Sequence, residues 1–239
     1  MSQELTKDWL KIEKVIQETP DTKTLRIGLK QPMDFIPGQF VMAGLNVGDP
    51  KNLLVKRAFS IASSPLEKQF IELTFNVVPE GKFSPHLYAL KEGDLVYIEG
   101  PYGKFNFKED GSKYFIFLGA GTGISPLMSM IRYMEQMGIK SPKYLIYSVK
   151  KPENIIYRKE LEDLEKKKLL DVNITITRPD GTGWKGLTGR INEEMILELA
   201  AVLEEVVFYM CGPPEMVEGT VKILESMGIQ KEKINREQW

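Results

Sequence analysis

The sequence is poor in the side chains that most often bind metals or act in nucleophilic catalysis. Its 239 residues include one cysteine, Cys211, and one histidine, His86. One cysteine excludes an internal disulfide and a four-cysteine iron–sulfur or zinc site within this chain. One histidine excludes clusters of histidine ligands and most catalytic triads that contain histidine. We therefore expect no metal site, and difficult chemistry would require a cofactor.

Long apolar runs and an excess of charge of one sign are also absent. No apolar run approaches the length of about 18 residues that is typical of a transmembrane helix. The N-terminal segment MSQELTKDWLKIEKV carries too many charges for a signal peptide. The net charge is −1, so no global field favours nucleic acid or an acidic membrane surface, although local patches are not excluded. We expect a cytoplasmic protein with no membrane insertion and no nucleic-acid partner.

The hydrophobic pattern changes near residue 108, and the length suits one large domain or two domains of ordinary size. Before this point, short strand-like runs alternate with turn residues, which is typical of an antiparallel barrel or sandwich. One short helix is expected at 84–90. The strand-like runs are 22–29, 38–45, 57–62, 70–78 and 94–100.

After residue 108, continuous apolar runs alternate with helical segments. Such runs indicate strands that are buried on both faces, and the alternation predicts a doubly wound parallel sheet. We predict an antiparallel β-barrel domain at 1–108 and a Rossmann-like domain at 109–239. The expected strands are 114–119, 144–149, 172–177 and 206–211, and the expected helices are 125–138, 157–168, 192–203 and 214–227.

A glycine-rich segment, GAGTGISP (119–126), connects the first of these strands to a helix. Glycines there let a phosphate approach the backbone, and the free amides at a helix start attract anions. The spacing departs from the usual dinucleotide fingerprint G-x-G-x-x-G, because Ile124 occupies the sixth place. A tight turn without a ligand explains two glycines, but it explains three less easily. We interpret the segment as a phosphate-binding turn.

Basic residues follow the next two strands. An NAD-selective site carries an acidic residue near the end of the second strand, whereas Lys150 is found here, with Arg178 after the third strand. With Arg190, this pattern favours a nucleotide with an additional phosphate, although surface arginines are common. Cys211 ends the fourth strand, in MCGPPEM (210–216). It is either a buried structural cysteine or a ligand contact at the carboxyl edge of the sheet.

The segment RAFSIASSP (57–65) combines a cation, an aromatic ring and small residues. Arg57 and Phe59 are two residues apart on an expected strand, and nearly all the following residues are small. A flat anionic ligand that approaches the backbone would account for these features. The sequence ends with Trp239, an unusual choice for a frayed terminus.

Four motifs, in order along the chain, resemble those of the ferredoxin–NADP reductase family in its short bacterial form. RAFS (57–60) resembles the flavin signature R-x-Y-S, and VPEGKFSPHL (78–87) resembles the G-x-x-S segment. GAGTGISPL (119–127) resembles the nicotinamide-nucleotide phosphate loop, and CGPPEM (211–216) resembles C-G-x-P-x-M. Each motif is weak alone, whereas four in register over essentially the whole chain are strong.

The resemblance implies that FAD binds to the first domain. Arg57 would hold an FAD phosphate, and the ring of Phe59 would lie along the isoalloxazine. Ser60 would come near the flavin N5, and Ala58 belongs to the same cofactor-binding set. The family usually has tyrosine in place of Phe59, so the stacking surface is kept and a phenolic hydrogen bond is lost. The residues expected around the FAD pyrophosphate are Gly81, Lys82, Phe83 and Ser84.

The resemblance also implies that NADP(H) binds to the second domain. The residues expected at its pyrophosphate are Gly121, Thr122 and Gly123. Those expected around the 2′-phosphate are Lys150, Arg178 and Arg190, with Thr177 as a further cofactor-binding residue. Cys211 and Gly212 would flank the nicotinamide, Glu237 matches an acidic residue near the flavin, and Trp239 resembles an aromatic that stacks on it. Ser60, Cys211, Glu237 and Trp239 are the expected catalytic residues.

By resemblance, the expected reaction is hydride transfer between the nicotinamide C4 of NADPH and the flavin N5, with single-electron transfer to a ferredoxin or flavodoxin. The nearest alternative is an NADH-dependent reductase component of an oxygenase system, whose partner carries the iron–sulfur centre. A different class is a non-catalytic flavin-binding electron-transfer or regulatory subunit. The basic strand ends and Trp239 argue against this last class.

Overall fold

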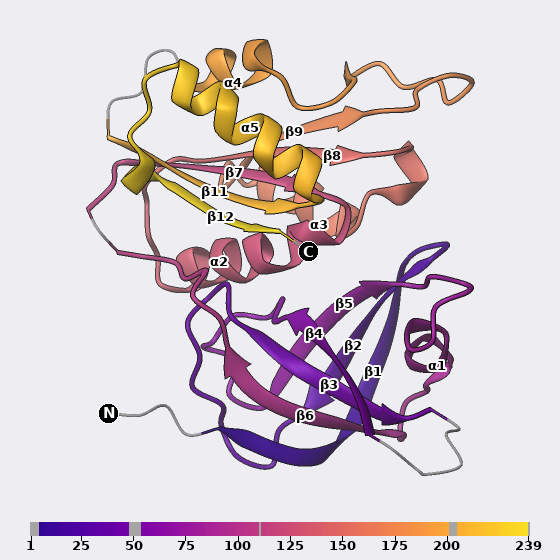
Figure 1. The fold of residues 1–239 in the computed structure, drawn as a ribbon. Helices are drawn as coiled ribbons and strands as arrows, with labels where there is room; N and C mark the ends of the chain where they lie inside the picture. The colour runs from indigo at the N-terminus through magenta and orange to yellow at the C-terminus, as the bar shows by residue number, and fades with distance from the viewer. Residues whose placement is uncertain (1–4, 48–53, 110, 201–204, 239) are drawn as a thin grey trace. The chain divides into compact units, whose positions relative to one another are not determined.

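The structure, a computed structural model, describes residues 5–47, 54–109, 111–200 and 205–238. The expected catalytic residue Trp239 therefore lies outside the described residues. The chain forms two compact units (Figure 1). Unit 1 contains Met1–Phe107 and Met128–Gln136, and unit 2 contains Lys108–Leu127 and Met137–Trp239. The functional boundary near residue 108 stays a prediction, and unit 1 also includes part of a later helix.

Unit 1 is built on six strands, and every paired strand in it runs antiparallel. The sheet order is β4-β3-β6-β1-β2-β5, and a bridge between Ile61 and Leu73 joins its two edges. The sheet therefore closes on itself, which confirms the predicted antiparallel barrel. The elements are β1 (Thr6–Thr19), β2 (Thr22–Gly28), β3 (Phe40–Asn46), β4 (Leu54–Ser60), β5 (Phe70–Asn76), α1 (Ser84–Ala89) and β6 (Leu95–Tyr102).

Strand β1 is the element of the barrel that the sequence analysis missed. Its charged residues hide the strand pattern, but Leu10 and Ile12 are buried in the core at 2% and 0% exposure. Because successive side chains of a strand point to opposite faces, Lys7 and Lys11 lie on the outer face. Pairing with both β2 and β6 makes this polar segment a central strand.

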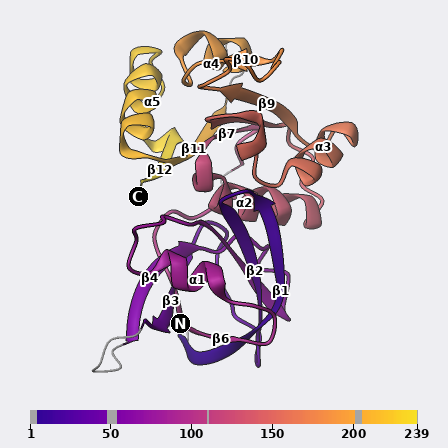
Figure 2. The ribbon, with the colours of Figure 1, turned by 90° about the vertical axis from the view of Figure 1, so that its right-hand side faces the viewer.

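Unit 2 is built on six parallel strands in the order β10-β9-β8-β7-β11-β12. Helices α4 and α5 pack on one face of this sheet, and α3 lies on the other (Figures 1 and 2). This arrangement confirms the predicted doubly wound sheet. The strands are β7 (Tyr114–Ala120), β8 (Lys143–Val149), β9 (Asp171–Ile176), β10 (Leu187–Thr188), β11 (Val206–Gly212) and β12 (Ile234–Gln238). The helices of unit 2 are α3 (Arg158–Lys166), α4 (Glu193–Ala200) and α5 (Pro214–Ser226), and the first residues of α2 (Ile124–Gln136) also belong to it.

The sequence analysis did not predict the edge strands β10 and β12. Strand β10 has two residues, and β12 is the mostly polar segment INREQ. An edge strand has one neighbour and one open side, so it lacks the continuous apolar run of a central strand. Strand β12 places the residues before Trp239 beside β11. None of the described helices is both long and apolar enough to cross a membrane.

Candidate functional site

In unit 1, strand β4 carries the expected flavin-binding residues Arg57, Ala58, Phe59 and Ser60. Arg57 and Phe59 share one face of the strand, since side chains alternate. The guanidinium of Arg57 is exposed, and its Nη1 donates to the backbone oxygen of Lys56 at 2.8 Å. No described carboxylate forms an ion pair with Arg57, so its other N–H groups can donate hydrogen bonds to an anion. The ring of Phe59 is half-buried and stacks 6.1 Å from the ring of Phe83, centroid to centroid.

A tight turn before α1 contains the residues expected at the FAD pyrophosphate. The Gly81 amide donates to the Val78 oxygen at 2.8 Å, and the Ser84 hydroxyl accepts from the Val78 amide at 2.9 Å. Phe83 is 4% exposed, so its ring belongs to the barrel core and its backbone alone can face a ligand. Lys82 is exposed. The turn is shaped by its own hydrogen bonds, and its contact with pyrophosphate stays a prediction.

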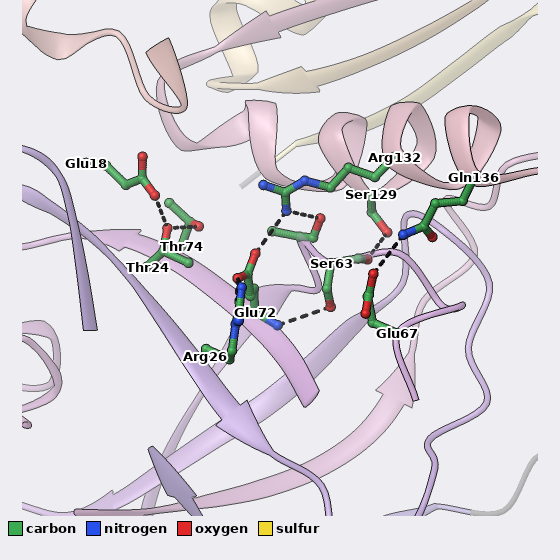
Figure 3. A network of polar contacts seen from close by, with 11 residues as sticks. Glu18, Thr24, Arg26, Ser63, Glu67, Glu72, Thr74, Ser129, Arg132 and Gln136 are labelled. Atoms are coloured by element: carbon green, nitrogen blue, oxygen red, sulfur yellow. Dashed lines mark hydrogen bonds and ion pairs between the residues drawn. The ribbon is translucent and has the colours of Figure 1, made fainter. Parts of the chain in front are cut away.

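The small residues after β4 are buried by the protein itself. Ala62, Ser63 and Ser64 are at most 2% exposed. Arg132 of α2 donates to the Ala62 oxygen at 2.8 Å, and Ser129 donates to the Ser63 oxygen at 2.7 Å (Figure 3). Close packing under α2 accounts for the size of these three residues, so the expectation that they make room for a ligand is wrong.

Two arginines hold the buried carboxylate that lies below this segment. The side chain of Glu72 is 7% exposed, and its Oε2 accepts from Arg132 at 3.1 Å. Its Oε1 accepts from Nε and Nη2 of Arg26 at 3.1 and 2.9 Å (Figure 3). A buried carboxylate without partners is costly, and these cations compensate its charge. The sequence analysis did not single out Glu72 or Arg132, because they are distant in sequence and belong to no motif.

In unit 2, the glycine-rich turn lies directly against the end of β11. Gly121, at the start of the turn, has φ = 53°, a left-handed conformation that favours glycine. A Cβ on Gly123 would lie 2.2 Å from the backbone oxygen of Cys211. Gly119 is paired with Cys211 across the sheet. The structure thus brings Gly121, Thr122 and Gly123 together with Cys211 and Gly212 at the carboxyl edge of the sheet, where open α/β folds bind ligands.

Cys211 and Glu237 lie opposite each other on the neighbouring strands β11 and β12. Cys211 is 1% exposed, and Glu237 is half-buried. Burial disfavours the ionised carboxylate and raises the pKa of Glu237 to about 7. Near neutral pH this carboxyl can therefore exist with or without its proton. The register of β12, which the sequence analysis did not predict, creates this pair.

The three basic residues follow the ends of neighbouring strands: Lys150 follows β8, Arg178 follows β9 and Arg190 follows β10. The Arg178 amide donates to the Lys150 oxygen at 2.9 Å, and both side chains are exposed. The Thr177 amide donates to the Val149 oxygen at 2.9 Å, which also links the ends of β8 and β9. The Arg190 guanidinium instead lies 3.3 Å from Glu215 near the start of α5. Within the described part of the chain, no group of three or more acidic, histidine or cysteine side chains could hold a metal.

Two family models together match most of the chain. The model of the oxidoreductase FAD-binding domain matches residues 9–107, within the barrel half. The model of the oxidoreductase NAD-binding domain matches residues 117–222, which carry the glycine-rich turn and Cys211.

Whole-chain comparisons agree with these matches. The chain is 32% identical to the glycine betaine monooxygenase reductase subunit of Pseudomonas aeruginosa over 94% of its own length and 62% of that protein. It is 31% identical to NADH-cytochrome b5 reductase 2 of Candida glabrata over 87% of its length and 72% of that protein. A crystal structure of a ferredoxin NADP+ reductase from Neisseria gonorrhoeae with bound FAD and NADP matches at TM-score 0.81 and 25% identity, covering 100% and 99% of the two chains. The chain thus spans less than two thirds of the first of these relatives.

Proposed function

The chain belongs to the ferredoxin–NADP reductase-like family of FAD- and NAD(P)-binding oxidoreductases, and from this premise we propose that it passes electrons between a nicotinamide nucleotide and a redox protein. The contact of Gly123 with the Cys211 carbonyl is the observation that carries the proposal. It leaves a turn with two glycines beside the buried residue Cys211, at the sheet edge where a nucleotide pyrophosphate and its nicotinamide can lie side by side.

The residues of unit 1 fit FAD. Arg57, which is exposed and has no partner among the described carboxylates, suits a phosphate, and the half-buried ring of Phe59 on the same face suits a flat ring system. When bound, FAD would accept a hydride equivalent from the nucleotide and release electrons one at a time. Arg57 would bind and orient the cofactor, and Ser60 at the end of β4 would lie near its reactive edge.

In unit 2, the chain would position the nucleotide and manage charge. The turn amides of Gly121, Thr122 and Gly123 would bind its pyrophosphate. Cys211 and Gly212 would form the wall beside the nicotinamide and exclude water from it. Glu237, whose pKa is about 7, would stabilise positive charge on the oxidised nicotinamide when ionised. The partner would be a ferredoxin or flavodoxin.

We expect Glu237 to give the reaction a pH dependence that Glu237→Gln removes. Burial raises its pKa from 4.5 to about 7, so the carboxyl is neutral below pH 7 and negative above it. The rate of flavin reduction at saturating nucleotide should therefore rise between about pH 6 and 8, and the variant should be flat and slow. Stopped-flow absorbance across this range measures the effect, with the exposed Glu218→Gln as the matched control.

The same pKa shift has a consequence for stability, with a defined sign. A group whose pKa is raised on folding contributes stability that is fully present below its unfolded value and is lost as pH rises through the folded value. For Glu237 this window runs from 4.5 to about 7. Denaturant unfolding should show Glu237→Gln losing that part of the pH dependence. If the pH profiles of rate and of stability are the same for Glu237→Gln and for the unaltered protein, the proposal that a buried Glu237 titrates in this range is contradicted.

For the coenzyme we propose NADPH, because Lys150, Arg178 and Arg190 provide cations near the ends of β8 and β9. Arg178→Ala and Arg190→Ala should each raise the KM for NADPH by about tenfold or more, since a charge-assisted contact to phosphate is lost. The KM for NADH should hardly change. Arg190 forms an ion pair with Glu215, but both side chains are 81% exposed. Such an ion pair is weak, so it leaves the charge of Arg190 able to attract a phosphate. Lys159→Ala, an exposed cation on α3, is the control, and equal losses for both coenzymes would assign the arginines a structural role.

A second candidate is an NADH-dependent reductase component of an oxygenase. It is favoured by the similarity to a glycine betaine monooxygenase reductase subunit, of which the aligned part of this chain covers 62%. Anaerobic stopped-flow reduction with NADPH and NADH in parallel, followed by addition of ferredoxin or flavodoxin, separates the candidates. Preference for NADH and failure to reduce either carrier would favour the oxygenase component. Failure of both coenzymes to reduce bound flavin would favour a non-catalytic subunit.

A further inference from the structure

A buried tyrosine of unit 2 is hydrogen-bonded to the glycine-rich turn. Tyr147 lies on β8, is 0% exposed, and its hydroxyl donates to the backbone oxygen of Gly121 at 2.9 Å. The same oxygen accepts from the amide of Ile124 at the start of α2. Two donors from different elements therefore fix the direction of the Gly121 carbonyl. Without them the backbone of this residue would be weakly restricted, because it is glycine.

The direction of this carbonyl decides where the next amide points. A trans peptide is planar, so its C=O and N–H groups point in opposite directions. The Gly121 oxygen faces Tyr147, and the Thr122 N–H consequently faces away from it, out of the start of the helical segment. Amides at this position have no partner within the helix and are the groups that bind phosphate oxygens.

We propose that Tyr147 is a positioning residue, which holds the Thr122 amide in the orientation that receives the pyrophosphate of the nucleotide. This inference rests on the proposed function of the turn. Tyr147 touches neither the nicotinamide nor the flavin in this role, so it governs nucleotide affinity and leaves the chemical step unchanged.

Tyr147→Phe tests the inference, because it keeps the ring in the core and removes the hydroxyl. The KM for NAD(P)H and the inhibition constant of ADP-ribose, which carries a pyrophosphate and no nicotinamide, should both rise about three- to tenfold. The limiting rate of flavin reduction and the flavin spectrum should stay unchanged. Tyr209→Phe is the matched control, since Tyr209 is also 0% exposed and its hydroxyl accepts from the Lys108 amide at 2.9 Å. Tyr209→Phe should lose about as much thermal stability as Tyr147→Phe. Its KM for NAD(P)H and its inhibition constant for ADP-ribose should stay unchanged.

A second variant makes the test independent of stability. Thr122→Pro removes the amide itself, because proline has no N–H. It should weaken ADP-ribose binding, and adding Tyr147→Phe to it should weaken binding no further, since the two changes act on one contact. Additive losses, or a Tyr147→Phe protein with the unaltered inhibition constant, overturn the inference. If the unaltered protein binds no ADP-ribose, the proposed function is overturned together with this inference. If the unaltered protein and Tyr147→Phe bind ADP-ribose equally well, only this inference is overturned.

Discussion

Arg57→Ala protein is expected to be purified with little or no bound FAD. The guanidinium of Arg57 is exposed on β4, shares a face with the ring of Phe59, and forms no ion pair with a described carboxylate. A charge-assisted hydrogen bond contributes about 1.5–3 kcal/mol, so losing one to a phosphate should weaken FAD binding roughly ten- to a hundredfold. Flavin absorbance per protein after purification and fluorescence titration of the apoprotein measure this.

Lys56→Gln is the matched control for this change. Lys56 precedes Arg57 on the same strand, but its side chain points to the opposite face and is paired with Glu99. The control should keep its FAD, while its ion pair with Glu99 is lost. Equal FAD content in the two variants would remove Arg57 from the cofactor site. If the unaltered protein is stable and colourless and does not bind added FAD, the flavin proposal itself is contradicted.

Gly123→Ala is expected to abolish reduction by nicotinamide nucleotides, with a rate loss on the order of a hundredfold or more from misplacement of the bound ligand. The added Cβ would lie 2.2 Å from the Cys211 oxygen and 2.8 Å from the Gly212 nitrogen, both backbone atoms. No rotamer change relieves such a clash, so the turn or the end of β11 must move. Overpacking of this kind also costs about 1–3 kcal/mol of stability. Stopped-flow reduction and thermal unfolding measure the two effects.

The FAD content of Gly123→Ala is an internal check on this prediction. The barrel has its own hydrophobic core, so the variant should retain FAD. Gly219→Ala is the matched control. Gly219 lies within α5, an added Cβ there meets nothing within 4 Å, and alanine should stabilise the helix by about 0.5–1 kcal/mol. Reduction of Gly123→Ala at the unaltered rate would show that the turn does not bind the nucleotide.

Much of the fold follows from the sequence pattern. Period-two alternation in segments such as 22–29 marks strands with one buried face, and unbroken apolar runs such as 114–119 mark strands buried on both. These local signals distinguished an antiparallel barrel from a parallel doubly wound sheet. They failed at β1 and β12, whose many polar residues lie on an outer face or an open edge. A polar strand is recognisable when its neighbours are known, which is information that a linear pattern lacks.

For the candidate site, too, the sequence determined one part and the tertiary structure determined the other. The sequence by itself determined the residue types: a cation and a ring on one strand, glycines between a strand and a helix, and a cysteine at a strand end. The tertiary structure decided their surroundings. Burial under α2 explains the small residues at 62–64, and the register of β12 places Glu237 beside Cys211. Burial of Glu237 raises its pKa, and the hydroxyl of Tyr147 donates a hydrogen bond to the Gly121 oxygen. Pairing, burial and hydrogen-bond direction depend on residues distant in sequence, so no local motif could determine them.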